Sequence, residues 1–413
     1  MPRVDRVLWL GLLTVVALRP WVLDLVVPER ILTVQWAGLC IGLAWWLSQR
    51  GWRKPLHPHL LWPCLLLWFG CLTSATLSED RLEALLQAQA LTFGIVLCAA
   101  AALAPWPRRQ QLLIVLIAAS TALALHGLWQ AAVLFPAFER FDWSRLTPEA
   151  YVADFATEVI ARRRVFGPFP LPGLLAAALI LLLPVSVSVL RPWATTPPRR
   201  LIARLVFGVQ GAALLLTQSL GGFCALGAAT VVVLLIRRRP WWQPASVLCL
   251  ALVCIGTLLL IRPELSNPDH PRNPIVQRFR YWQSTAGMIR DHPLRGIGAG
   301  NYALVYPRYQ RPQATQARFA HNAWLQTWAE WGIVGLVGLA ALSVGSIRLA
   351  SGHPIGFQIA LWAFWMLASI DITWSILQVA CLFWPLLGIL SHTDHAERRE
   401  AVRRGGGPDR TPA

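Results

Sequence analysis

The sequence predicts an all-α, polytopic integral membrane protein with about twelve transmembrane helices and one long extracytoplasmic loop that contains short helices. Of its 413 residues, 56% are hydrophobic and only 14% are charged, whereas a soluble domain carries about 25% charged residues. Uncharged apolar runs recur along almost the whole chain, each close to the ~20 residues that a helix needs to cross a ~30 Å hydrocarbon core. Basic residues gather between these runs in a regular alternation. A soluble fold is therefore excluded.

Twelve apolar segments have the length of a membrane span. The first follows Arg3 and Arg6 and resembles a signal sequence, but no clear small-x-small cleavage site is present, so it is interpreted as a retained signal anchor. The predicted spans lie near residues 7–27, 31–48, 60–77, 84–105, 111–136, 168–190, 201–219, 221–236, 242–261, 331–348, 354–371 and 374–391.

Physical arguments set the ends of the predicted spans in two regions. Residues 205–236 form one uncharged run of 32 residues, which as a single helix would reach ~48 Å, too long for one crossing. A turn at Gly221-Gly222 is therefore predicted to divide it into two spans. Because a charge at mid-membrane is costly, Asp371 is predicted to sit at a turn near a membrane surface.

Arginine-rich segments such as Arg237–Arg239 alternate with charge-balanced ones. The positive-inside rule then puts both termini in the cytoplasm and leaves two long extracytoplasmic segments, 137–167 and 263–330. The predicted division is an N-terminal five-span region (1–136), a central four-span region with the loop 137–167 (137–262), a catalytic loop (263–330), a C-terminal three-span region (331–392) and a cytoplasmic basic tail (393–413).

The loop 263–330 holds the residues suited to chemistry. Guanidinium groups grip phosphate through paired hydrogen bonds, so its arginines suit an anionic headgroup or a diphosphate, although each could equally belong to a solvated rim. None of the eight cysteines lies in this loop, so neither a disulfide framework nor a thiolate metal site is expected. The loop also lacks an acid cluster for a divalent metal, which leaves charge neutralisation to arginine.

His321 is the strongest single candidate for a catalytic residue. It stands at the start of a helical stretch at the membrane surface, and histidine can take a proton near neutral pH. Asn322, Gln326 and Glu330 follow at spacings that share one helix face. The alternative is a capping or interfacial histidine. The string Gly296-x-Gly298-x-Gly300 allows tight turns and close backbone approach, but it follows no strand, so a dinucleotide site is rejected.

These residues carry a resemblance to the O-antigen ligase family, whose members share a domain with the O-antigen polymerases. The resemblance is weaker at Arg164-x-x-Gly167-x-Phe169 and at Thr217-Gln218-Ser219. It is specific at Arg278 with Trp282, at the run from His292 to Tyr302, at His321-Asn322 with Leu325-Gln326, at Glu330-x-Gly332, and in the Asp371 span that ends in Phe383-Trp384-Pro385-Leu386-Leu387-Gly388.

The resemblance implies a metal-independent, inverting glycosyltransferase of lipopolysaccharide biosynthesis, with its active loop on the periplasmic side of the bacterial inner membrane. The donor would be a glycan on a polyprenyl (undecaprenyl) diphosphate, and the acceptor a lipid A-core sugar. His321 would be the base that activates the acceptor hydroxyl. No cofactor is implied. Diphosphate or substrate binding is expected from Arg164, Arg278, Arg280, Asn322, Gln326, Gly298 and Tyr302.

Two positions depart from the family pattern, and other functions stay open. Many members have arginine where this chain has Leu220, and asparagine where it has Gly173. Either Arg280 or Arg164 substitutes for the missing arginine, or the substrate is altered, or activity is lost. The alternatives are a polymerase that acts on lipid-linked repeat units, a small-anion (bicarbonate-like) transporter, which the scarcity of mid-span charge disfavours, and a non-catalytic scaffold.

Overall fold

The computed structural model describes residues 2–22, 28–49, 56–138, 159–270 and 273–391. These residues form helices and connecting segments and contain no strand, which confirms the all-α prediction for the described part of the chain. Within these described ranges, seven helices are long and apolar enough to cross a membrane. The fold is therefore that of a helical membrane protein, while the number of twelve spans stays a prediction.

Each predicted span coincides with a helix. Most of the predicted loop 137–167 and the whole tail 393–413 lie outside the described residues. The helices at the predicted spans are α1 (Pro2–Leu18), α2 (Pro28–Ser48), α3 (Pro58–Ala75), α4 (Arg81–Leu103), α5 (Trp106–Trp129), α8 (Pro172–Trp193), α9 (Pro197–Thr217), α10 (Leu220–Ile236), α11 (Trp242–Ile261), α14 (Ala323–Ser351), α15 (Ile355–Ala368) and α16 (Leu377–Leu390).

The first helix is shorter than the predicted span. Helix α1 ends at Leu18 and a 3₁₀ turn, Arg19–Trp21, follows, so the predicted span is not one continuous helix, and its last residues, 23–27, lie outside the described residues. The reason is local: Pro20 has no N–H to continue the helical hydrogen bonds, and the fully buried Arg19 turns its guanidinium back to the carbonyl of Val22, 3.1 Å away.

The long uncharged run 205–236 is divided as predicted, but at Gln218-Ser219 rather than at Gly221-Gly222. Helix α9 ends at Thr217, the next residue Gln218 adopts a left-handed conformation with φ 49°, and Ser219 caps α10 by accepting a hydrogen bond from the N–H of Gly222 at 3.2 Å. Gly221 lies in the first turn of α10, where a Cβ would meet the Ile370 and Leu367 side chains at 3.2 Å. Glycine at this position therefore allows α10 to pack closely against the end of α15.

Helix ends that the predicted topology puts on the same side do meet in space. Arg108 at the start of α5 pairs with Asp5 of α1, and its guanidinium lies 5.6 Å from the ring of Trp9. Arg237 at the end of α10 donates to the Gln358 Oε1 of α15 at 3.0 Å. Asp371 falls in the connection between α15 and α16, which confirms its predicted place in a turn.

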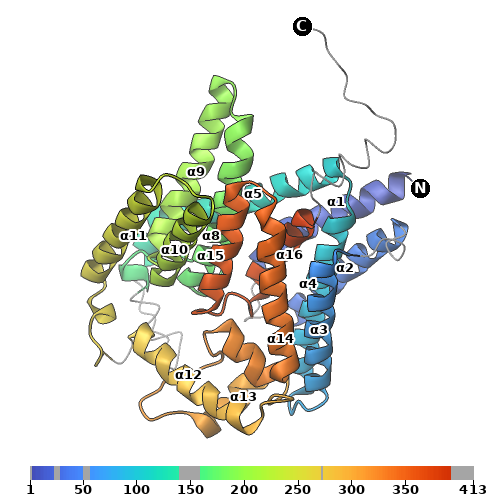
Figure 1. Ribbon diagram of the computed structural model, residues 1–413, viewed down its shortest axis with the longest axis vertical. Coiled ribbons are helices and arrows are strands. Elements are labelled where there is room, and N and C mark those ends of the chain that lie inside the picture. The colour runs from blue at the N-terminus through green and yellow to red at the C-terminus, as the bar shows by residue number, and fades with distance from the viewer. Residues whose placement is uncertain (1, 23–27, 50–55, 139–158, 271–272, 392–413) are drawn as a thin grey trace.

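Residues 263–270 and 273–330 form a cap at one end of the helical bundle (Figure 1). The cap contains a 3₁₀ turn (Pro263–Leu265), α12 (Pro274–Asp291), α13 (Tyr302–Tyr309) and the first turns of α14. Tyr281, Met288, Tyr302 and Tyr306 are among the buried residues of its small apolar core. The amphipathic helix predicted to run through Met288 is thus α12.

Helix α14 is interrupted where the predicted tenth span begins. Gly332 has φ 67° and ψ −165° and breaks the helical backbone. The carbonyl of Leu294 lies so close to Gly332 that any side chain would collide with it. This contact joins the cap to the membrane part of α14 and gives the Glu330-x-Gly332 motif a structural reason.

Candidate functional site

A cavity of about 450 Å³ opens where the cap meets the ends of the helices, a volume within the range of small-molecule sites. Four arginines and two carboxylates line it, so its ionised side chains carry an excess of two positive charges. Those side chains are Arg164, Arg262, Arg278, Arg318, Glu264 and Asp371, and His321 lies among them.

Several helices begin at the cavity wall. The first residues of α8, α10 and α12 line it, and so does Ile376, which precedes α16. The first N–H groups of a helix have no partner within the helix, and the helix dipole makes this end positive. Backbone and side chains therefore contribute potential of the same sign, and the cavity is suited to an anion.

His321 takes part in a chain of polar contacts inside the cavity. Its Nδ1 lies 3.4 Å from Asp371 Oδ1, and Arg278 Nη2 donates to Asp371 Oδ2 at 2.9 Å. The N–H of Ile372 donates to Asp371 Oδ1 at 2.8 Å. Because an ionised carboxylate only accepts hydrogen bonds, Nδ1 of His321 carries the proton and Nε2 is the basic nitrogen.

Asp371 is kept ionised by its neighbours. Burial alone would raise the pKa of its carboxyl group, but the charge of Arg278 and the hydrogen bond from His321 outweigh burial and hold that pKa far below its usual value. Gly173 stands beside it, and a Cβ there would lie 3.1 Å from Asp371 Oδ2. The departure at Gly173 therefore leaves space next to this carboxylate.

The backbone conformation and the neighbouring residues fix the position of His321. The residue adopts a left-handed conformation, φ 52°, which is uncommon outside glycine and stores strain. Its ring stacks on Tyr281 of α12 with centroids 5.7 Å apart. Asn322 then caps α14 by accepting hydrogen bonds from the N–H groups of Trp324 and Leu325, each 3.0 Å. The capping role belongs to Asn322, which leaves the imidazole available in the cavity.

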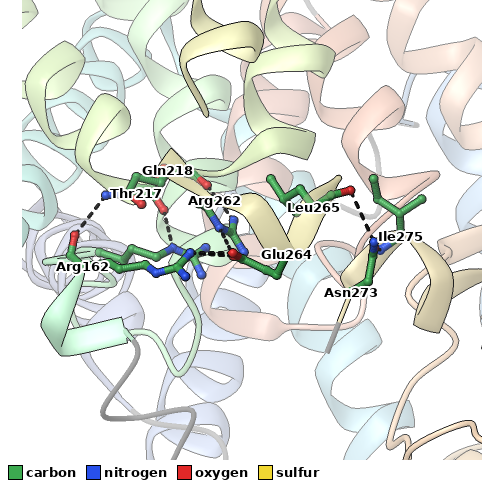
Figure 2. Close-up of polar contacts among 9 residues, drawn as sticks. Arg162, Thr217, Gln218, Arg262, Glu264, Leu265, Asn273 and Ile275 are labelled. Carbon is green, nitrogen blue, oxygen red and sulfur yellow. Dashed lines mark hydrogen bonds and ion pairs between the residues drawn. The ribbon is translucent and has the colours of Figure 1, made fainter. Parts of the chain in front are cut away.

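A second polar cluster surrounds the turn between α9 and α10 (Figure 2). Arg164 Nε lies 3.4 Å from the carbonyl oxygen of Thr217, and Arg262 Nη1 donates to that of Gln218 at 3.2 Å. Glu264 binds two arginines: Arg262 Nε at 2.8 Å and Arg162 Nη1 at 2.6 Å. Burial would raise the pKa of Glu264, but these two hydrogen bonds lower it below its usual value.

The structure thus brings Arg164, Arg278 and His321 to one cavity, as the sequence-based site requires. It adds three residues that sequence reasoning did not assign to the site: Arg262, Glu264 and Asp371. Asp371 was noticed only as an unusual acid in an apolar region, and Arg262 only as a charge at the edge of the loop. An acid within an apolar stretch was the available signal, because such a group needs a partner.

Other candidates lie outside the residues that line the cavity. Arg280 is partly exposed and donates hydrogen bonds to Gln313, to its carbonyl oxygen at 2.7 Å and its side-chain oxygen at 3.1 Å. Gln326 Oε1 accepts the N–H of Ala320 at 2.6 Å. These contacts hold the cap together, and a role in substrate binding for Arg280, Asn322 and Gln326 stays a prediction.

Gly298 and Tyr302 are also held within the cap. Gly298 has φ 103°, and a Cβ there would lie 2.8 Å from the Cα of Ser78, so the glycine permits close contact with the α3–α4 connection. Tyr302 is buried, with its hydroxyl 2.8 Å from Thr285 Oγ1. Among the described residues, no group of three or more His, Cys, Asp or Glu is placed to hold a metal ion.

Fold and site together define a polytopic helical membrane protein with an anion-accepting cavity beneath a cap. Residues 205–340 match the family model of the O-antigen ligase. This match confirms, over about a third of the chain, the resemblance seen in the sequence. The matched segment includes Arg262, Arg278 and His321, whereas Arg164 and Asp371 lie outside it. No curated protein matches the chain.

Proposed function

We propose that the protein is a membrane glycosyltransferase of the ligase type, which moves a glycan from a polyprenyl diphosphate carrier to a lipid A-core or similar acceptor sugar at the periplasmic face of the inner membrane. One observation carries the proposal: a histidine, oriented by a carboxylate, faces a cavity with an excess of two positive charges. The family match supports the same class of reaction.

In the proposed reaction, His321 is the general base. The acceptor hydroxyl gives its proton to Nε2 while its oxygen forms a bond to the anomeric carbon. The bond between that carbon and the diphosphate oxygen breaks, and the electron pair leaves with the diphosphate. Attack from the face opposite the leaving group inverts the anomeric configuration. Asp371 accepts the hydrogen bond from Nδ1 at 3.4 Å and stabilises the imidazolium as it forms.

The leaving group is the reason for the cationic wall. Negative charge grows on the diphosphate as it departs, and preorganised cations stabilise it without reorganisation. Arg278 is suited to this task because one of its amines is fixed by Asp371 at 2.9 Å and the residue lines the same cavity. The arginines can supply this stabilisation without a metal ion, which is why a metal-independent reaction is proposed. Apolar residues such as Leu265 and Ile372 also line the cavity and suit the start of a lipid chain.

The acceptor separates the proposed ligase from the alternative polymerase. Both would use the same donor and the same base, so the cavity favours neither. The transporter alternative gains no support from the family match.

Purified protein in lipid vesicles tests the proposal. We expect glycan transfer from a polyprenyl diphosphate donor to lipid A-core, unchanged in rate by EDTA, with an inverted anomeric centre by NMR. Transfer to a second donor molecule, with none to lipid A-core, would establish the polymerase instead. If neither acceptor is glycosylated while the donor binds, the transferase proposal is wrong.

A further inference from the structure

The Arg162–Glu264–Arg262 cluster lies beside the reaction centre but has no part in the proton transfer described above. Glu264 is buried, with 6% of its surface exposed, and Arg262 is 7% exposed. Burying two charged groups is unfavourable unless they are paired and hydrogen-bonded. The arrangement therefore calls for a reason beyond holding the turn together.

Arg262 is fixed at two of its three nitrogens. Nε donates to Glu264 at 2.8 Å and Nη1 donates to the carbonyl oxygen of Gln218 at 3.2 Å. Nη2 has no hydrogen-bond partner among the described residues, and the residue lines the cavity. An arginine held in this way presents its remaining N–H groups in a fixed direction, which is how guanidinium recognises phosphate oxygens.

Glu264 does more than neutralise Arg262. Arg162 binds both of its carboxylate oxygens, at 2.6 and 2.8 Å. Because one carboxylate is shared by two arginines, the three groups together carry one net positive charge, and Arg262 presents part of it to the cavity that it lines. Arg162 comes from the segment before α8, and Arg262 from the end of α11, so the cluster also fixes the distance between these two elements.

The start of α10 completes the surroundings of Arg262. Ser219, Leu220 and Gly221 line the cavity, and the N–H groups of Leu220 and Gly221 belong to the first turn of the helix. Arg262 contacts the residue just before Ser219, and therefore lies next to Leu220, where this chain lacks an arginine. A cation from α11 thus occupies the neighbourhood that α10 leaves uncharged.

We propose that Arg262 and the first turn of α10 form a second phosphate subsite, separate from the Arg278–His321–Asp371 centre, and that Glu264 and Arg162 are its positioning residues. The inference rests on the proposed function. The phosphate attached to the sugar would bind near Arg278, where its bond breaks, and the phosphate attached to the lipid would bind at Arg262. The protein would then distinguish a lipid diphosphate from a lipid monophosphate.

The test is competition between undecaprenyl diphosphate and undecaprenyl monophosphate for a fluorescent donor analogue, with purified protein in nanodiscs. We expect the wild type to prefer the diphosphate by tenfold or more, and Arg262→Gln to lose most of that preference, since a hydrogen bond to a charged group corresponds to about tenfold or more in affinity. Arg290→Ala is the matched control, because this exposed arginine lies at the far end of α12 from Arg278; its preference should equal that of the wild type.

Glu264→Gln distinguishes positioning from simple charge. The substitution removes a negative charge from the wall, so if net charge alone governed binding, both lipids would bind more tightly. If Glu264 orients Arg262, the diphosphate preference falls instead. Thermal unfolding of each variant checks that it is folded. If Arg262→Gln does not fold, Arg262→Lys replaces it in the competition experiment.

The outcomes separate this inference from the proposed function. A wild-type preference that survives in folded Arg262→Gln or Arg262→Lys overturns the subsite, even if transfer activity is present. A wild type that transfers glycan but shows no preference between the two lipids also overturns it. Absence of transfer with an intact, Arg262-dependent preference refutes the transferase proposal and leaves the subsite standing.

Discussion

The glycine-rich segment 292–302 and the cavity wall around Arg262, Arg278 and His321 belong to the same cap, yet their polar groups have different partners. In the glycine-rich segment, Asn301 Oδ1 accepts hydrogen bonds from Ser78 Oγ at 2.8 Å and from the N–H of Asp80 at 3.2 Å. In the cavity wall, Arg278 binds the carboxylate of Asp371 at 2.9 Å, and Arg262 Nη2 has no hydrogen-bond partner among the described residues.

The comparison shows that the segment with the most motif residues need not be the catalytic site. The glycines attach the cap to the membrane helices: a Cβ on Gly300 would press on Glu83 of α4, and one on Gly298 on Ser78. The cavity, in contrast, is built from residues contributed by α8, α10, α12, the segment after α11, the segment before α14 and the α15–α16 connection. The two regions should therefore respond differently to substitution, the first in stability and the second in turnover.

The largest loss of turnover is expected from His321→Ala. Removal of a general base lowers the rate about 10²–10⁴-fold, while donor binding should persist because the cavity arginines remain. The measurement is single-turnover transfer with saturating donor. Asn322→Ala is a useful companion, because it removes the cap of α14 and should lower stability more than rate. Normal transfer by His321→Ala would remove the histidine from the mechanism.

A smaller loss of turnover is expected from Asp371→Asn. The amide cannot stabilise the imidazolium, so transfer should slow on the order of a hundredfold, less than after removal of the base itself. Because the pKa of Asp371 lies far below its usual value, its charge is present across the working pH range. Protonation of Asp371 should therefore not cause the loss of rate at acid pH. Measurement of the transfer rate against pH in the wild type and in Asp371→Asn checks this. A variant as fast as the wild type would show that Asp371 does not act on His321.

The glycine-rich segment should respond in stability. Gly298→Ala adds a Cβ 2.8 Å from the Cα of Ser78 in a residue with φ 103°, and such strain costs about 1–3 kcal/mol. The thermal midpoint in detergent should fall, while the folded fraction keeps its transfer rate. Gly208→Ala in α9 is the control, because a Cβ there meets nothing within 4 Å. If Gly298→Ala leaves the thermal midpoint unchanged, or if the folded variant transfers glycan more slowly, the proposed difference between the two regions is wrong.

Hydropathy alone located the helices, because a bilayer requires apolar runs of a set length and does not depend on their arrangement. Arg278 and His321 were accessible through motif resemblance. Asp371, Arg262 and Glu264 were not, because their roles arise from contacts between distant segments: 93 residues separate Arg278 from Asp371, and 102 separate Arg162 from Glu264. The end of α1 at Leu18 was missed because the apolar pattern continues past Pro20.

Acid should weaken the cavity wall through Glu264. Its pKa is lower in the folded protein than its usual value, so its ion pairs stabilise the fold above the usual glutamate range and lose that effect as pH falls through the lowered value. The thermal midpoint of Glu264→Gln should therefore fall less steeply than that of the wild type as the pH drops below the usual glutamate value of about 4.3. Glu79→Gln, at an exposed site, serves as control. Parallel curves for Glu264→Gln and the wild type would contradict a charged Glu264.

The smallest effect is expected at Arg280, and it tests the boundary of the cavity. The sequence motif predicts a diphosphate contact, but the structure directs this partly exposed guanidinium to Gln313, at 2.7 and 3.1 Å. Exposed interactions of this kind contribute about 0–1 kcal/mol, so Arg280→Ala should keep a transfer rate within about fivefold of the wild type. Arg278→Ala, two residues away on α12, should lose far more, because it removes the partner of Asp371 and a cation of the cavity. Equal losses in the two variants would mean that the donor reaches beyond the cavity, and that the division between cap and site lies further along α12.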